Sequence, residues 1–119
     1  MPRTIHRQKV FSGQVSQNGT AYSDVYEFNK CSGDSACLIS STAGSITVTQ
    51  QVSFDKINWY APVDESNGAL DGIASAVTVT TGRWVAFSPV LAPFTRFKIV
   101  EGNVAATTVN ITAMFQEDW

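Results

Sequence analysis

The stretch SITVTQQVSFDKINWY, residues 45–60, determines the fold class predicted for this chain. Between residues 46 and 54, apolar side chains alternate with Thr, Gln and Ser, and Gln50 is the one polar residue at an apolar position. This period of two is the pattern of a half-buried β-strand. Asp55 and Asn58 then suit a tight turn, and Trp59 begins a second apolar run. The stretch therefore predicts a strand, a short connection and a returning strand, which together form a hairpin at the centre of an all-β domain.

Further segments with strand-like patterns surround this hairpin. Their ranges are 9–11, 22–28, 37–39, 77–80, 83–87, 94–100 and 107–115. Turn signals such as Asn18-Gly19 separate them, and the ranges 77–80 and 83–87 predict a second hairpin. No segment has sustained helical periodicity. The sequence thus predicts an all-β fold of about eight strands in a single domain, an antiparallel β-sandwich or jelly roll.

Length, charge and hydropathy exclude several classes of function. With 119 residues the chain suits one domain, and a net charge of -2 gives no global attraction to nucleic acid or to an anionic membrane. No apolar run approaches the ~20 residues of a membrane-spanning helix, and the N-terminus lacks the apolar stretch of a secretory signal peptide. We expect no nucleic-acid partner, no membrane partner, and synthesis in a cytoplasm. The low charged fraction of 15% is usual in β-sandwiches and also suits a surface covered by other subunits.

The first ten residues are basic, because they contain Arg3, Arg7 and Lys9 and no acidic residue. A solvated chain end is one interpretation of this segment. The other is an attachment arm, residues 1–10, ahead of a β-sandwich domain, residues 11–119. In that case Ile5 lies in a short strand that can add to a sheet edge of a partner, and the cations attract an acidic neighbour. We predict this arm, with Arg3, Ile5, Arg7 and Lys9 as its contact residues.

Two cysteines, Cys31 and Cys37, flank a segment that predicts a loop. They could form a disulfide once the chain leaves a reducing cytosol, or remain two free thiols, and the sequence leaves both states open. Two thiols without a nearby histidine or second cysteine pair fall short of a zinc site.

No catalytic, cofactor-binding or metal-binding residue is predicted. Ser35 follows Gly33-Asp34, yet the only histidine is His6, in the basic segment, so no base accompanies a serine nucleophile. Acidic residues between 64 and 71 fit a solvated loop better than a calcium site. We therefore expect a protein that is not an enzyme and that uses no cofactor.

Several aromatic residues are candidates for an interface or for stacking on sugar rings. They are Tyr22, Trp59, Tyr60, Trp84 and Trp119. Packing in the core or between subunits accounts for aromatics more often than sugar binding does. Both interpretations remain open from the sequence.

Three short motifs resemble a group of small virion proteins of tailed phages. The motifs are Ser-Phe-Asp-Lys-Ile-Asn-Trp-Tyr at 53–60, Ala-Pro-Phe-Thr-Arg-Phe-Lys at 92–98, and Glu-Gly-Asn at 101–103 before a final Thr- and Val-rich strand. In that group an Asn-Trp hairpin precedes an aromatic-Arg-aromatic strand and a closing strand. A Gly often follows the Asp of the turn there, whereas this chain has Lys56. The resemblance implies a β-sandwich with a structural role in the head, a fibre or another appendage.

On this resemblance we expect a bacteriophage virion structural protein, specifically a capsid decoration or cement protein. Its expected partners are the major capsid protein or another virion protein and further copies of itself, with a trimer favoured. Its expected location is the virion. The alternative is an adhesin or carbohydrate-binding β-sandwich module, which glycan binding that depends on Trp84 would indicate.

Overall fold

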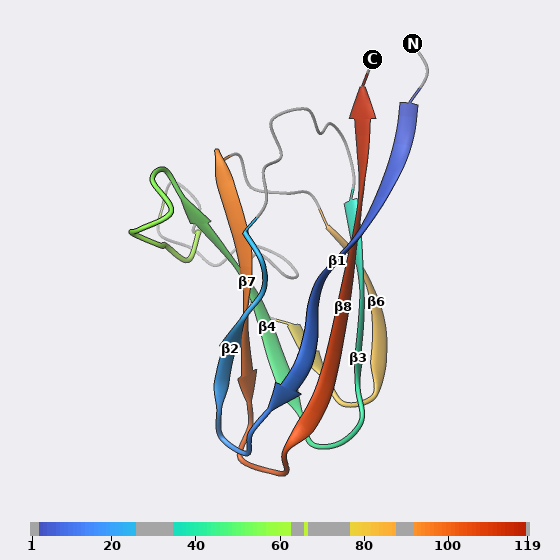
Figure 1. Cartoon of the computed structure of the whole chain (residues 1–119), viewed down its shortest axis with the longest axis vertical. Coiled ribbons are helices and arrows are strands. Elements are labelled where there is room, and N and C mark those ends of the chain that lie inside the picture. Colours follow the sequence, from blue (N-terminus) through green and yellow to red (C-terminus); the bar gives the residue numbers. More distant parts are fainter. Residues whose placement is uncertain (1–2, 26–34, 63–65, 67–76, 88–91, 119) are drawn as a thin grey trace.

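The computed structural model describes residues 3–25, 35–62, 66, 77–87 and 92–118. In these ranges the chain forms eight strands in two antiparallel sheets, which confirms the predicted all-β fold (Figure 1). The strands are β1 (Arg3–Val15), β2 (Thr20–Tyr22), β3 (Ser35–Ser41), β4 (Ile46–Ser53), β5 (Val77–Val79), β6 (Gly82–Phe87), β7 (Phe94–Glu101) and β8 (Thr107–Asp118).

The order of the strands is that of a jelly roll. Sheet A has the order β1-β8-β3-β6, and sheet B has the order β2-β7-β4-β5. Consecutive strands alternate between the two sheets except for β4 and β5, which pair with each other in sheet B. This order matches an eight-stranded jelly roll, one of the two architectures predicted.

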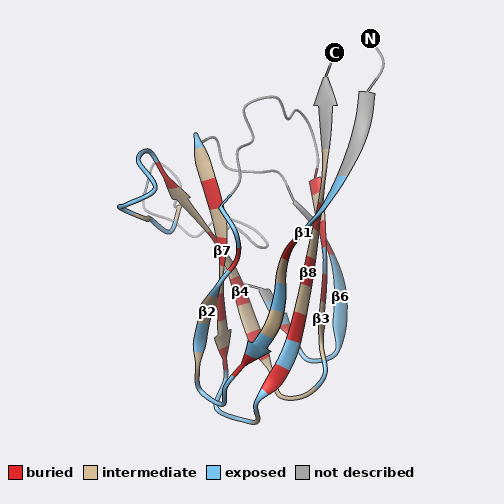
Figure 2. Cartoon of the chain, in the orientation of Figure 1, coloured by how far each residue is buried: buried red, intermediate tan, exposed pale blue. Residues whose placement is uncertain are grey.

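The core lies between the two sheets and comes from alternate residues of each strand (Figure 2). Along β4 and β7, Ile46, Val48, Phe97 and Ile99 are fully buried, while the residues between them face outward. The period of two thus predicts the buried face correctly along β7 and from Ile46 to Gln50 of β4. At the end of β4 the prediction is wrong, because Ser53 is buried and Val52 only partly so. The remaining buried apolar residues are Val10, Val15, Cys37, Ile39, Val79, Val85, Val109, Ile111 and Ala113.

The predicted second hairpin is wrong. β5 pairs with β4 in sheet B, whereas β6 pairs with β3 in sheet A, so the chain crosses between the sheets after Val79. In that crossing the backbone N–H of Ser41 donates to the carbonyl of Thr81 at 2.7 Å. Alternation along a strand identifies its buried face and not its pairing partner, so the sequence pattern was compatible with both arrangements.

The central hairpin is also shorter than predicted. β4 ends at Ser53, and the returning segment forms only an isolated bridge between Val52 and Tyr60. Two backbone hydrogen bonds join these two residues, at 2.9 and 3.0 Å. The residues between them form a loop instead of a second strand.

The N-terminal residues belong to a strand from Arg3 onward. β1 pairs with β8 from Arg3 opposite Asp118 to Val15 opposite Thr107, with a bulge between Lys9 and Phe11. The backbone of the segment predicted as an arm therefore continues sheet A. β2 ends at Tyr22, so the strand predicted over 22–28 is wrong for residues 23–25, which are described and lie outside any strand. Residues 26–28 lie outside the described residues.

A buried carboxylate joins the loops at the end of the sandwich opposite the β4 loop. The Glu101 side chain is fully buried, and its oxygens accept hydrogen bonds from the backbone N–H of Asn18 at 2.9 Å and of Val104 at 3.0 Å. Further N–H donors are Ser45 and Ala105, at 3.4 and 3.5 Å. These donors, Asn18 first, hold the pKa of Glu101 below its usual value.

Candidate interaction surface

Three exposed apolar side chains lie on the loop that follows β4. In this segment, Phe54–Tyr60, here called the apolar loop, Phe54 is 85% exposed, Ile57 79% and Tyr60 64%. The loop projects sideways from the end of β4, away from the two sheets (Figure 1). Single exposed apolar residues are common, but three within seven residues form a patch that suits contact with another protein.

Hydrogen bonds to the side chains of Ser53 and Asp55 fix the backbone of this loop. The backbone N–H groups of Ile57 and Asn58 both donate to Asp55 Oδ1 at 2.9 Å, and Asn58 Nδ2 donates to Asp55 Oδ2 at 3.0 Å. The N–H of Lys56 donates to Ser53 Oγ at 2.9 Å. Because these bonds favour the carboxylate, those from Asn58 and Ile57 most, the pKa of Asp55 falls to about 2. The loop is therefore a hydrogen-bonded turn with a defined shape.

Lys56 occupies a backbone conformation that normally favours glycine. Its φ angle is 65°, in the left-handed region. This is the position at which the resembling phage proteins often have Gly. The side chain of this lysine has a partner, because its Nζ lies 4.6 Å from the centre of the Phe94 ring. The contact joins the loop to the outer face of β7.

A second contact joins the loop to sheet B through Arg96. The guanidinium carbon of Arg96 lies 4.3 Å from the centre of the Trp59 ring and 4.0 Å from that of Tyr22. Its Nε donates to Gln51 Oε1 at 2.9 Å. This group, here called the arginine stack, brings β2, β4, β7 and the loop together. It positions Trp59 at the base of the loop and leaves Phe54 and Ile57 pointing away into solvent.

A shallow depression of about 150 Å³ lies beside the loop. Its lining residues are Val52, Ser53, Phe54, Tyr60, Ala92 and Pro93. Small-molecule sites usually enclose about 300–1,000 Å³, so this depression is small for such a ligand. Its size and apolar lining suit a single side chain of a protein partner.

The aromatic residues predicted as a platform come together only in part, because Tyr22 and Trp59 both lie against Arg96 whereas Trp84 lies on the other sheet. Tyr22, 46% exposed, is part of the arginine stack on sheet B. Trp84, 63% exposed, lies on β6 in sheet A. Trp119 lies outside the described residues. Tyr22 and Trp84 therefore belong to different surfaces.

The predicted arm residues Arg3, Ile5, Arg7 and Lys9 all lie in β1. In the register with β8, Arg7 is opposite Met114 and Lys9 is opposite Thr112. Both side chains are exposed, on the outer face of sheet A. They are thus well separated from the apolar loop of sheet B.

Cys37 is a free thiol that faces the core from β3. Burial raises the pKa of this thiol to about 12. Cys31, its candidate disulfide partner, lies outside the described residues, as do the acidic positions 64, 65 and 71. Ser35 is buried at the start of β3, and not in a loop as predicted.

Among the described residues, no three of His, Cys, Asp and Glu lie close enough together to hold a metal ion. The same part of the chain has no helix of the length and hydropathy needed to cross a membrane.

The sequence analysis missed the residues that define the apolar loop and its support. Phe54 falls on the buried parity of β4, so the pattern predicts it to face the core, yet the strand ends one residue earlier. The signal that could have located the turn is the spacing of Ser53, Asp55 and Asn58, which suits side-chain bonding to the backbone of a turn. Arg96 lies in one of the quoted motifs, but its partner Tyr22 is distant in sequence, so no local pattern connects them.

No family model matches this sequence, and no curated protein matches it. The fold is similar to the crystal structure of the SPBc2 prophage-derived protein YomS, from a prophage of Bacillus. The two structures align with a TM-score of 0.67 over 98% of this chain and 96% of the other, at 11% sequence identity. The similarity therefore extends over nearly the whole of both chains, and at this identity it concerns the fold.

Proposed function

We propose that this chain is a structural protein of a phage particle, specifically a capsid decoration protein that binds the head surface and neighbouring copies. The observation on which this proposal mainly rests is the apolar loop, with three large apolar side chains exposed on a fixed turn. Such a loop suits binding to protein, because rigid exposed anchors lose little conformational entropy when they insert into a recess.

Two further observations support a phage-related role. Jelly rolls are common in viral capsid and lectin domains, and the structural neighbour is itself prophage-derived. The three sequence motifs resemble virion proteins of tailed phages. Fold alone does not determine function, so the proposal depends on the surface of this chain as well as on the likeness.

Glycan binding has less support. Of the candidate rings, Tyr22 and Trp59 share sheet B but both lie against Arg96, whereas Trp84 belongs to sheet A. We therefore prefer a protein partner to a carbohydrate partner. The partner in the particle would be the major capsid protein or another virion protein, and we propose that the chain assembles as a homo-oligomer there, with a trimer favoured.

The test is to find the chain on purified particles of the phage that encodes it. An epitope-tagged copy should sediment with the particles, resist washing, and give added density on the head in electron cryomicroscopy. The Phe54→Ala/Ile57→Ala variant should bind particles from a deletion phage about tenfold or more weakly than the unmodified chain. Its melting temperature should stay nearly unchanged, because both side chains are mostly exposed.

Val104→Ala provides a matched control. Val104 is 62% exposed and lies near Glu101, at the other end of β7 from the apolar loop. This variant should bind particles as well as the unmodified chain. Absence of the tagged chain from the particles would refute a virion role, and undiminished binding of the loop variant would refute the role of the loop.

A further inference from the structure

The outer face of sheet A combines cations with exposed apolar side chains in two adjacent rows. One row crosses all four strands, because the pairing places Lys9 opposite Thr112, Thr112 opposite Leu38, and Leu38 opposite Trp84. In the next row Arg7 is opposite Met114, and Met114 is opposite Ala36. Each row therefore runs from a cation on β1 toward apolar side chains farther across the sheet.

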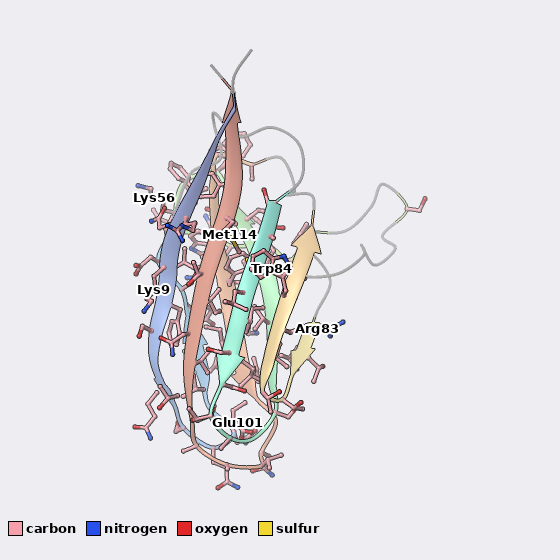
Figure 3. All side chains as sticks on the ribbon, turned by 90° about the vertical axis from the view of Figure 1, so that its right-hand side faces the viewer. Lys9, Lys56, Arg83, Trp84, Glu101 and Met114 are labelled. Carbon is pink, nitrogen blue, oxygen red and sulfur yellow. The ribbon has the colours of Figure 1, made fainter. Side chains whose placement is uncertain are left out.

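These side chains point away from the core. On β3 the residues on either side of Leu38, Cys37 and Ile39, are fully buried, whereas Leu38 is 44% exposed. On β6 the neighbour of Trp84, Val85, is buried. Figure 3 shows this face toward the viewer, with Lys9 on β1, Met114 on β8 and Trp84 on β6.

The described strand residues of this face have positive charge, although the whole chain has a net charge of -2. Their outward side chains include the cations Arg7 and Lys9 and no carboxylate. The carboxylate of Asp24, which follows β2, lines a depression together with Lys9 at the β1 edge of the sheet. Among the other outward positions of these strands are small polar residues such as Ser12 and Asn110, which bond to each other at 2.8 Å. Within the described part of the chain, neither Arg7 nor Lys9 forms an ion pair with a residue of its own molecule.

We infer that this face docks on an acidic protein surface that has an apolar recess for Trp84. Tryptophan and arginine are the residues that most often dominate the energy of protein interfaces, and cations on the same face as such an anchor favour a partner of opposite charge. This inference depends on the proposed function in one respect, namely that the partner is a protein of the phage particle. It adds a second surface, on the opposite sheet from the apolar loop.

A second copy of this chain is a poorer occupant. Two copies packed by this face would bring four cations together with no described carboxylate between them. In one orientation Lys9 of each copy would form a cation–π contact with Trp84 of the other. The two Arg7 side chains would then still have no partner of opposite charge or aromatic ring in that interface. An acidic partner neutralises all the cations of the face, so charge complementarity favours it.

The test uses a synthetic peptide of about twelve residues in which Glu alternates with Phe and Leu, added to the isotope-labelled chain and followed by NMR. The resonances that shift should be the Trp84 indole N–H and the methyl groups of Leu38 and Met114. Binding should weaken at least about threefold when salt rises from about 50 to about 300 mM, because exposed charges are screened. A matched peptide with Gln in place of Glu should bind more weakly, and one with Lys should not bind.

Two variants of equal exposure make the test specific. Trp84→Ala should weaken peptide binding about tenfold or more, whereas Val104→Ala should leave it unchanged, because Val104 is similarly exposed but lies near Glu101, away from both proposed surfaces. Exchanging both Arg7 and Lys9 for Gln should remove most of the salt dependence. The corresponding control is Lys98→Gln, a cation on the outer face of sheet B.

Four results would overturn the inference. They are no shift with the Glu peptide, equal binding of the Lys peptide, shifts confined to the apolar loop, and binding to vesicles of phosphatidylserine but not to the Glu peptide. Self-association that Trp84→Ala abolishes would also overturn it, in favour of a second copy. If the chain is absent from particles yet the Glu peptide binds at Trp84, the proposed function fails while the assignment of this face stands.

Discussion

The arginine stack gives a quantitative prediction for Arg96→Lys. Lysine retains the positive charge but has no planar group to stack between two rings, and it has no Nε donor in the position of the guanidinium. In the structure the guanidinium lies 4.0 and 4.3 Å from the centres of the Tyr22 and Trp59 rings and donates to Gln51 at 2.9 Å. The substitution therefore removes three contacts without changing the net charge.

The expected loss of stability follows from these contacts. Each cation–π contact contributes about 0.5–1 kcal/mol at a partly exposed site, and the hydrogen bond contributes about 1 kcal/mol. The lysine regains part of this by contact of its ammonium group with one ring. We expect a decrease of about 1–2 kcal/mol in the free energy of unfolding, equivalent to roughly 4–8 °C in the melting temperature of a domain of this size.

Urea unfolding followed by far-ultraviolet circular dichroism measures this loss. The control is Lys98→Gln, on the same face of the same strand, which should change stability by less than about 0.5 kcal/mol. A double-mutant cycle of Arg96→Lys with Trp59→Leu should give a coupling energy of about 0.5–1 kcal/mol.

Additive effects in that cycle would show that Arg96 and Trp59 do not interact. A stability of Arg96→Lys within about 0.3 kcal/mol of the unmodified chain would refute the stack itself. Either result would leave the Lys56–Phe94 contact and the Val52–Tyr60 bridge as the contacts that attach the apolar loop to sheet B.

Three further predictions concern the carboxylates of Asp55 and Glu101 and the buried thiol of Cys37. The lowered pKa of Asp55, about 2, stabilises the fold above pH of about 4 and this contribution disappears as pH falls toward 2, so the difference in melting temperature between Asp55→Asn and the unmodified chain should shrink over that range. Glu101→Gln should lower the melting temperature at neutral pH in thermal scans, because the amide nitrogen of Gln cannot accept bonds from the backbone donors that Glu101 binds. In a Cys31→Ser variant, Cys37 should react with a thiol reagent at pH of about 8 only after unfolding, because the thiol is buried and its pKa is raised to about 12. Rapid reaction in the folded state would contradict this burial.

The strands and their buried faces could be predicted because both follow from local sequence. β7 and β8 alternate without interruption, and Asn18 has the positive φ of 58° that its place in an Asn-Gly turn suggests. The fold class depends on the number and spacing of such segments, so it could also be predicted from the sequence.

The pairing of strands and the candidate surfaces depend on residues that are far apart in sequence. Whether β5 pairs with β4 or with β6 is decided by packing between the sheets, and Thr80 and Thr81 contain no signal for either outcome. The exposure of Phe54 depends on the end of β4 at Ser53, where side-chain bonds to the turn replace those of the ladder. The row from Lys9 to Trp84 exists only through the register of four strands.

The positions of the two surfaces give a physical reason why a jelly roll suits the proposed role. The apolar loop is joined to the outer face of sheet B through Phe94 and Arg96, whereas Trp84 lies on the outer face of sheet A. The packed core between the sheets holds these surfaces at a fixed separation. A protein that connects two neighbours gains from this rigidity, because after the first contact forms, the second site meets its partner at a high effective concentration. Two contacts of modest affinity can then give stable attachment, whereas the loss of either surface would leave only the affinity of the other.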